Sequence, residues 1–445
     1  MKHLSSRTRA LCFTCCAALV FLPGRTMAQP WSLVRSLDEG LVPEGAHVVL
    51  EFQGDLLFVA ISGPSGGTVI AHQRHQGGLE QWGVLGTVHR DDPWFGRSIA
   101  VHGTTLAVGS PGAQAAGPFT GETRLYTIDQ EPGGDVLQPL GTLVLDDATS
   151  NDLFGYDVHW SGDTLAVSAV GRAEARSLGE VFLFTLSGGD PDWSGSLPSP
   201  LAELQVPFIR WFGARMASAG DRMAVAAPFS GFETSRPQQN IGALAIYRKD
   251  GAQPSGWVLD TAWADMRTDT GTTCSFQRME LGRWGLVFSG GELIMDHSRP
   301  YTGVVGNDLE PWLFPDPAPA CTTCGSLIVH NTDGHWGLSS AIALQPGDAA
   351  YMRGAEALTV FGDALFAGWF DPVGGSWMTE VHRRDQGGPG TWGVEQTIPA
   401  STLCDRLDGP LAADGVHLAR TTRQVDSGCG VPQGFFRLGL EVFGH

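Results

Sequence analysis

Short apolar runs arranged in pairs, each pair joined by a glycine-containing turn, form the main hydrophobic pattern of this chain. In the stretch FGYDVHWSGDTLAVSAV, from Phe154 to Val170, a Phe-Gly pair opens one run, a Gly-Asp turn reverses the chain, and an apolar run returns. Glycine suits such a turn because it tolerates the positive φ that tight hairpins require. The stretch therefore predicts two antiparallel strands.

The same pattern recurs along the chain. Openings at Phe95 and Phe212 repeat it, with the turn glycine eight residues after the phenylalanine and an apolar residue three positions later. Aligning the chain on this glycine gives seven positions, separated by 49 to 72 residues: Gly54, Gly103, Gly162, Gly220, Gly290, Gly362 and Gly415. Repeats of this length are typical of four-stranded propeller blades with their loops.

Each returning strand is followed by a candidate third strand, and in most units by a fourth. The third strands are expected at Thr68–His72, Thr123–Ile128, Glu180–Leu186, Ala243–Arg248, Ser326–His330, Met378–Arg383 and Phe435–Phe443. The fourth strands are expected to open at Trp82, Trp257, Trp336 and Trp392, and to lie without a tryptophan at Leu140–Leu145 and Leu201–Val206.

The two ends of the chain indicate how the ring closes. The last unit ends after its third strand, whereas a strand-like segment, Trp31–Leu37, precedes the first complete unit. Pairing these two segments removes two exposed sheet edges. The predicted fold class is therefore all-β: a seven-bladed β-propeller of four-stranded antiparallel blades, with the N-terminal strand closing the last blade. The alternative is an unpaired N-terminal tail.

The Phe-Gly openings, together with the endings Gly109-Ser110-Pro111 and Ala226-Ala227-Pro228, resemble the FG-GAP repeat of integrin-α-type β-propellers. The resemblance is sharp in three units and looser in the others, where Leu281-Gly282 stands one residue out of register. It suggests a bacterial secreted relative of that group, and it implies adhesion or ligand binding. The group's calcium loops are not matched, because the short turns here supply too few oxygen ligands. No metal or other cofactor is expected.

Residues 1–28 have the features of a signal peptide. Lys2, Arg7 and Arg9 form a positive start, an apolar run follows, and Thr26-Met27-Ala28 provides a small-residue cleavage site. An uncleaved anchor is the alternative. We expect an exported protein, either secreted, periplasmic or at the cell surface, in which residues 29–445 form a single β-propeller domain.

Charge and composition narrow the range of partners. The formal net charge is −19, and near −23 after removal of the four positive residues of residues 1–28. So acidic a chain has no electrostatic footprint for nucleic acid or for an anionic membrane. Charged residues make up 17% and glycines number 60, which favours strands and turns over long helices. A monomer without a membrane span is expected.

Five cysteines remain outside residues 1–28, and in an exported protein they are expected to form disulfides. Cys404 lies in a loop between units and Cys429 in the following second-to-third-strand loop, so the two are predicted to pair. Cys274 bears the same relation to Cys321 or Cys324, and the sequence leaves open which of the two is its partner. A Cys321–Cys324 bond is the competing possibility.

One rim of the ring carries the longest loops. With four antiparallel strands per unit, the loops between units and the second-to-third-strand loops emerge on the same side, where loops of a rigid scaffold usually bind ligands. Aromatic and charged residues beside the Phe-Gly-type openings are the candidate ligand-binding residues: Asp92, Trp94, Arg210, Trp211, Arg283 and Trp284. The alternative is that they cap the ends of the blades.

No established catalytic motif is present. HExxH and P-loop patterns are absent, and no GxSxG or dinucleotide-binding pattern stands between a strand and a helix. The leading hypothesis is thus a non-enzymatic module that binds a protein or glycan partner. The alternatives are a propeller hydrolase or lyase acting on polysaccharide through channel carboxylates, and a calcium-dependent adhesin.

Overall fold

The computed structural model describes residues 30–129, 136–172, 178–187, 190–196, 210–228, 230, 243–253, 255–264, 285–296, 325–332, 335–343, 358–371, 376–386, 391–401, 410–424 and 431–444. Every regular element in these residues is a β-strand. Residues 1–28 and the five remaining cysteines lie outside the described residues, so the signal-peptide and disulfide assignments stay predictions. The three longest loops, at 229–242, 265–280 and 299–325, also lie outside them, apart from Ser230 and Gly325.

Within the described residues the strands form seven antiparallel sheets of four strands each. Three of them follow one another in the first half of the chain. The first complete sheet contains β2 (His47–Gln53), β3 (Leu56–Gly63), β4 (Gly66–Gln73) and β5 (Gly83–Arg90). The next contains β6 (Ser98–His102), β7 (Thr105–Ser110), β8 (Glu122–Ile128) and β9 (Leu137–Leu143). The third contains β10 (Phe154–Ser161), β11 (Thr164–Ala169), β12 (Glu180–Ser187) and β13 (Asp190–Ser196).

Three more sheets repeat this order, and a seventh combines the two chain ends. They contain β14 (Arg215–Ala219), β15 (Arg222–Ala227), β16 (Ala243–Lys249) and β17 (Trp257–Ala264); then β18 (Leu286–Ser289), β19 (Glu292–Asp296), β20 (Gly325–Thr332) and β21 (His335–Ala343). Next come β22 (Leu358–Phe361), β23 (Ala364–Asp371), β24 (Ser376–Arg384) and β25 (Trp392–Pro399). The seventh contains β26 (Leu411–Ala413), β27 (His417–Gln424), β28 (Phe435–Gly444) and β1 (Ser32–Pro43).

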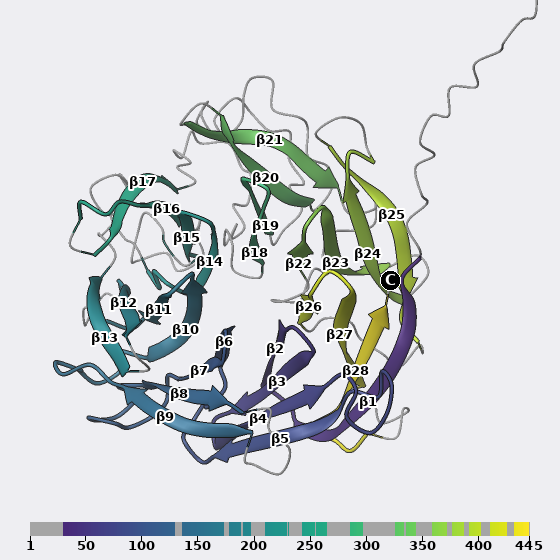
Figure 1. Ribbon diagram of the computed structural model, residues 1–445, viewed down its shortest axis with the longest axis horizontal. Coiled ribbons are helices and arrows are strands. Elements are labelled where there is room, and N and C mark those ends of the chain that lie inside the picture. Colours follow the sequence, from purple (N-terminus) through teal and green to yellow (C-terminus); the bar gives the residue numbers. More distant parts are fainter. Residues whose placement is uncertain are drawn as a thin grey trace, which may run out of the picture.

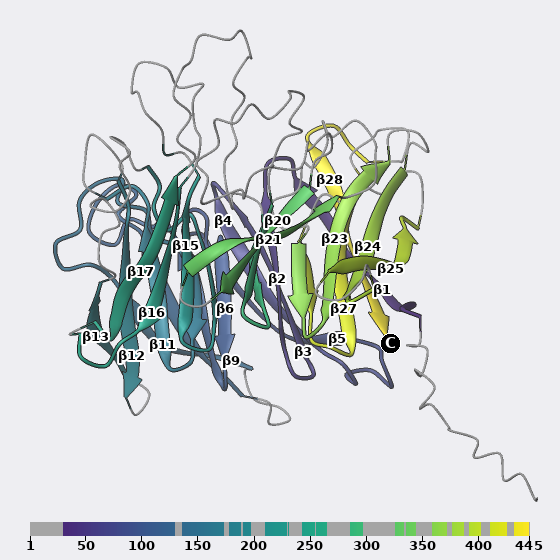
Figure 2. The ribbon, with the colours of Figure 1, turned by 90° about the horizontal axis from the view of Figure 1, so that it is seen from above.

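The sheets surround a common centre (Figure 1), and their strands run across the thickness of the ring (Figure 2). The first strand of each sheet is innermost and contacts the first strand of the next sheet, and β26 contacts β2. This arrangement is a β-propeller, as predicted. The predicted closure is confirmed as well, because β1 pairs antiparallel with β28 along its whole length, with Leu33 opposite Phe443 and Leu41 opposite Arg437.

The predicted repeat of turns and third strands is confirmed. All seven turn glycines connect the first and second strands of a sheet, and all have positive φ, between +53° and +89°. All seven predicted third strands coincide with observed ones to within a few residues.

One predicted strand was wrong. The fourth strand of the third sheet is β13, not Leu201–Val206, of which the structure describes nothing. Residues 190–194 open this strand. A proline at position 191 is compatible with it because β13 is the outermost strand, with a neighbour on one side only.

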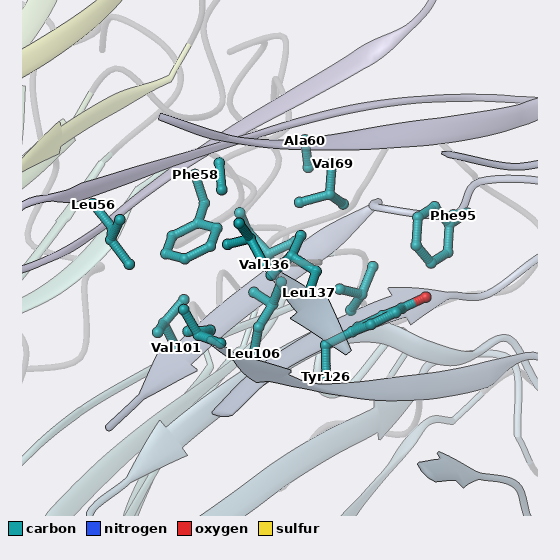
Figure 3. Packing of buried hydrophobic residues seen from close by; sticks show 14 residues of the cluster. Leu56, Phe58, Ala60, Val69, Phe95, Val101, Leu106, Tyr126, Val136 and Leu137 are labelled. Carbon is teal, nitrogen blue, oxygen red and sulfur yellow. The ribbon is translucent and has the colours of Figure 1, made fainter. Parts of the chain in front are cut away.

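Apolar side chains fill the layers between neighbouring sheets. Figure 3 shows the layer between the first two complete sheets, where Leu56, Phe58 and Val69 face Leu106 and residues of the adjoining strands. Alternation of side chains along each strand places one set on each face, so every sheet contributes to two layers. No sheet can bury both its faces alone, and stability depends on the complete ring.

The Phe-Gly pairs form joints between consecutive sheets. Phe95, Phe154 and Phe212 are almost completely buried, each in the layer that joins its sheet to the preceding one. The backbone of each pair also lies against a glycine that precedes the third strand of the preceding sheet or sits at its start. A Cβ atom on Gly121 would meet the carbonyl oxygen of Phe154, and one on Gly179 would meet that of Phe212. These close approaches explain glycine at both positions.

Buried histidines link the seventh sheet to the first. His72 of β4 approaches Glu39 of β1, with 3.2 Å between Nε2 and Oε1, and its Nδ1 lies 3.0 Å from a backbone carbonyl oxygen. His417 of β27 lies 3.5 Å from Glu80 and makes an edge-to-face contact with Trp82. These contacts join residues that are far apart in the sequence, Glu39 with His72 and Glu80 with His417.

Candidate functional site

The three Phe-Gly joints share an unusual backbone conformation. Trp94, Leu153 and Trp211, which immediately precede the phenylalanines, have φ of +61°, +57° and +58°. Large side chains rarely adopt positive φ, so the surrounding structure must hold each of them in place. We use the term Phe-Gly rim for residues 92–98, 153–157 and 210–215 together with His47, which lies at the start of β2.

The predicted charged residues of this rim have structural partners. Asp92 accepts a hydrogen bond of 3.3 Å from Nη2 of Arg124, whose Nε also pairs with Glu122. The backbone N–H of Arg210 donates to the hydroxyl of Ser230 at 3.0 Å. Asp92 therefore fits the alternative interpretation, in which these residues fasten the ends of the sheets. Arg283 and Trp284 lie outside the described residues.

The two predicted tryptophans differ in their surroundings. Trp94 is half-buried against the turn at Gly112, where an added Cβ atom would lie 3.0 Å from its ring. Trp211 is also half-buried and makes an edge-to-face contact with the ring of Tyr156, with 5.3 Å between the centroids. Trp211 is thus the predicted residue that the structure places in a larger aromatic group.

That group extends across four consecutive sheets. From Trp211 the row continues through Tyr156 to Arg97, whose guanidinium stacks over the tyrosine ring at 4.6 Å from the centroid and donates from Nη2 to the hydroxyl at 3.0 Å. Nη1 of Arg97 lies 2.5 Å from Nε2 of His47. Because arginine can only donate, Nε2 of His47 is the acceptor. All four side chains retain intermediate solvent exposure.

Arg97 differs from the arginines of this acidic chain that are paired with carboxylates. Within the described residues its guanidinium forms no ion pair, and its direct partners are an imidazole and a phenol. By contrast, Arg124, Arg172 and Arg383 each pair with two or three carboxylates. A partly exposed guanidinium held by neutral groups keeps its capacity to bind an anion.

Sequence reasoning missed Arg97 and Tyr156. Both stand two residues after the phenylalanine of a Phe-Gly pair, so alignment of the repeats marks them as equivalent positions. What the alignment does not show is that consecutive units bring these positions into contact.

Asp157 joins three sheets just below the row. Its Oδ1 accepts from the Ser98 hydroxyl at 3.0 Å, and its Oδ2 accepts from the backbone N–H of Met216 at 2.7 Å. Burial raises the pKa of Asp157 above its usual value, although the nearby guanidinium of Arg215 and these hydrogen bonds oppose the rise. Asp157 thus interacts electrostatically with the guanidinium groups of both Arg215 and Arg97.

Two further titratable residues lie on innermost strands. Glu51 of β2 is enclosed by protein although its side chain keeps intermediate exposure, and burial raises its pKa to about 8. His159 of β10 is held 2.9 Å from the Ser218 hydroxyl, and burial lowers its pKa to about 4. Both groups are therefore uncharged near neutral pH.

The described residues contain neither a metal-binding cluster nor a membrane-spanning helix. In the described part of the chain, no group of three or more His, Cys, Asp or Glu residues is arranged to hold a metal ion. No helix long and apolar enough to cross a membrane occurs in the described ranges.

A family model described as the FG-GAP repeat matches residues 140–184, a segment that includes Phe154, Gly155 and strands β10 and β11. The chain contains an FG-GAP repeat. The match covers about a tenth of the sequence and confirms the resemblance for one of the three units in which it is sharp. No curated protein sequence matches this chain.

Solved structures with a similar fold include three propeller-type proteins. The polysaccharide lyase Uly1 has a TM-score of 0.50 and 11% identity, with 91% of each chain covered. The WD40 domain of coronin from Toxoplasma gondii has a TM-score of 0.49 and 10% identity, covering 92% of this chain and 86% of its own. The Dos1 propeller has a TM-score of 0.47 and 8% identity, covering 87% and 75%. At these identities the likeness concerns the fold alone.

Proposed function

We propose that this protein is an exported, non-enzymatic seven-bladed β-propeller, each sheet being one blade, that binds a protein or glycan partner through its Phe-Gly rim. The observation that carries the proposal is the row of His47, Arg97, Tyr156 and Trp211, which crosses four sheets with its rings and guanidinium partly exposed. Rigid aromatic and arginine side chains contribute most strongly to binding surfaces.

The backbone conformation also supports ligand binding at the Phe-Gly rim. The strained positive φ of Trp211 is repeated at Trp94 and Leu153, and strain of this kind is concentrated at functional sites. The joint at Phe212 fixes Trp211 in position, because the Phe212 N–H donates to the Leu178 carbonyl and the Gly213 N–H donates to that of Ala226. A pre-organised aromatic ring loses little entropy when a ligand binds.

A polysaccharide-acting enzyme is the second candidate function. Glu51 favours it, because a carboxyl group that keeps its proton near neutral pH is suited to general acid catalysis. The binding function is preferred because no second carboxylate is shown facing Glu51 in the described residues.

A binding screen with matched variants tests the proposal. The full chain is applied to a glycan array and used for pull-down, with Trp211→Ala as the test variant and Phe361→Ala as the control. Phe361 is an exposed aromatic residue beside the turn glycine Gly362, at the opposite end of the innermost strands. Loss of binding in Trp211→Ala alone supports the proposal. Equal retention by both variants contradicts it.

A further inference from the structure

In the row of His47, Arg97, Tyr156 and Trp211, a guanidinium that forms no ion pair in the described residues lies beside two aromatic rings. We infer that this row binds an acidic saccharide and that Arg97 holds the carboxylate of a uronic acid unit. This inference rests on the proposed function and specifies the ligand class of that same rim.

The guanidinium of Arg97 is oriented for this task. His47 and Tyr156 each take one of its terminal nitrogens as donor, and the tyrosine ring supports its plane from one side. Of its five N–H groups, the remaining ones have no partner in the described residues. A planar fork fixed in this way suits bidentate binding of a carboxylate.

The neighbouring carboxyl group does not occupy the Arg97 guanidinium. Asp157, which interacts electrostatically with Arg97, is buried and accepts hydrogen bonds from the Ser98 hydroxyl and the Met216 N–H. In the described residues no ion pair or hydrogen bond joins Asp157 to Arg97, so the guanidinium remains available to a ligand carboxylate.

The aromatic members favour a sugar over an acidic peptide. Trp211 and Tyr156 are partly exposed rings in edge-to-face contact, and such rings offer apolar faces against which the C–H face of a sugar can pack. The Tyr156 hydroxyl accepts from Arg97 and keeps its own proton to donate to a ligand oxygen. Acidic peptides are usually held by clusters of arginines, whereas the row of His47, Arg97, Tyr156 and Trp211 contains a single arginine.

Calorimetric titration of the full chain with short oligomers of galacturonate, glucuronate and mannuronate tests the inference. The carboxyl-reduced, neutral counterparts of the same oligomers serve as matched ligands. We expect at least one acidic oligomer to bind, and its reduced form to bind roughly 10- to 100-fold more weakly, as for loss of one charge-assisted hydrogen-bonding group. Arg97→Gln should weaken acidic-oligomer binding by a similar factor.

Two further variants separate charge from structure. Arg97→Lys keeps the charge but loses the planar fork, so an intermediate loss of affinity is expected. Arg383→Gln removes a guanidinium that already pairs with Asp363 and Glu395 on the opposite rim, and it should bind as the unchanged protein does. Circular dichroism of each variant checks that it is folded.

Several outcomes would overturn the inference. These are equal affinity for acidic and reduced oligomers, no effect of Arg97→Gln, binding of none of the uronate oligomers, or tighter binding of poly-glutamate than of any uronate. If a neutral glycan or a protein is still lost in Trp211→Ala, the proposed binding function stands and only the ligand class is wrong. If Trp211→Ala has no effect on any partner, the proposed function itself fails.

Discussion

At the scale of single residues, glycine determines how closely consecutive sheets approach. Gly121 and Gly179 lie against the carbonyl oxygens of Phe154 and Phe212. At the turn glycine Gly54, by contrast, an added Cβ atom would meet nothing within 4 Å, and glycine is needed only for the positive φ. The sequence shows the turn glycines because they recur with the hairpin pattern. It does not show the joint glycines, since the atoms they meet belong to the next repeat.

The two kinds of glycine predict different costs of substitution. Gly54→Ala should lower the free energy of unfolding by roughly 1–2 kcal/mol, the cost of a left-handed conformation alone. Gly121→Ala has the same backbone cost at φ +81° and in addition drives a methyl group into the Phe154 carbonyl, so its loss of stability should be clearly larger. Denaturant unfolding of both variants measures the difference. Equal losses of unfolding free energy would contradict the close approach of Gly121 to the Phe154 carbonyl.

Glu51 predicts how stability depends on pH. Between 4.5, its ordinary pKa, and about 8, its pKa in the folded protein, the folded state keeps a proton that the unfolded state has released. Stability therefore falls as pH rises through this window, by no more than about 1.4 kcal/mol per pH unit. His159 acts in the opposite sense, since its pKa is lowered from 6.5 to about 4, and its effect is complete above pH 6.5.

The window from pH 6.5 to 8 thus separates the effect of Glu51 from that of His159. Glu51→Gln should flatten the decline of unfolding free energy in this range, whereas His159→Gln should leave it unchanged. Urea unfolding at several pH values provides the measurement. A decline as steep in Glu51→Gln as in the unchanged protein would show that another group is responsible.

At the scale of elements, most strands could be predicted because each repeat carries its own signals. Turn glycines and apolar alternation located the first three strands of every sheet, and the mismatch between the chain ends indicated the pairing of β1 with β28. The fourth strands are outermost, have a hydrogen-bonded neighbour on one side only, and have a weaker pattern. That is why β13, with its proline at the sheet edge, was missed.

The register of β1 on β28 can be tested with paired cysteines. Leu41 and Arg437 lie directly opposite each other and are both exposed, so the variant carrying Leu41→Cys and Arg437→Cys should form a disulfide without rearrangement. The variant carrying Leu33→Cys and Arg437→Cys should not form one. Leu33 lies eight residues before Leu41 in β1 and is paired with Phe443 instead of Arg437. Peptide mass mapping distinguishes the two, and equal cross-linking would exclude this register.

At the scale of the whole molecule, the ring makes its parts interdependent. The seam between the last and first sheets depends on β1, whose Glu39 reaches His72 of β4. Removing residues 30–43 would expose the edge of β28 and leave His72 without this partner. We expect a chain beginning at residue 44 to lose several degrees of thermal stability at the least, together with its single cooperative transition, as measured by calorimetry. An unchanged melting profile would show that β1 is dispensable.

The candidate site is the part of the molecule that the sequence reveals least. Trp211 could be recognised beside its Phe-Gly pair, but the contact of Tyr156 with Arg97 exists only because closure of the ring sets consecutive repeats side by side. Residue types and spacing within one repeat do not contain that information.

The central claim is that ligands bind on the Phe-Gly rim. Hydrogen–deuterium exchange of the full chain, with and without the partner that binds best in the screens, tests it most directly. The account predicts slower exchange on binding in residues 94–98, 154–158 and 210–216, and unchanged exchange at the turns containing Gly54, Gly103 and Gly162. Protection of those turns, with the Phe-Gly segments unaffected, would contradict it.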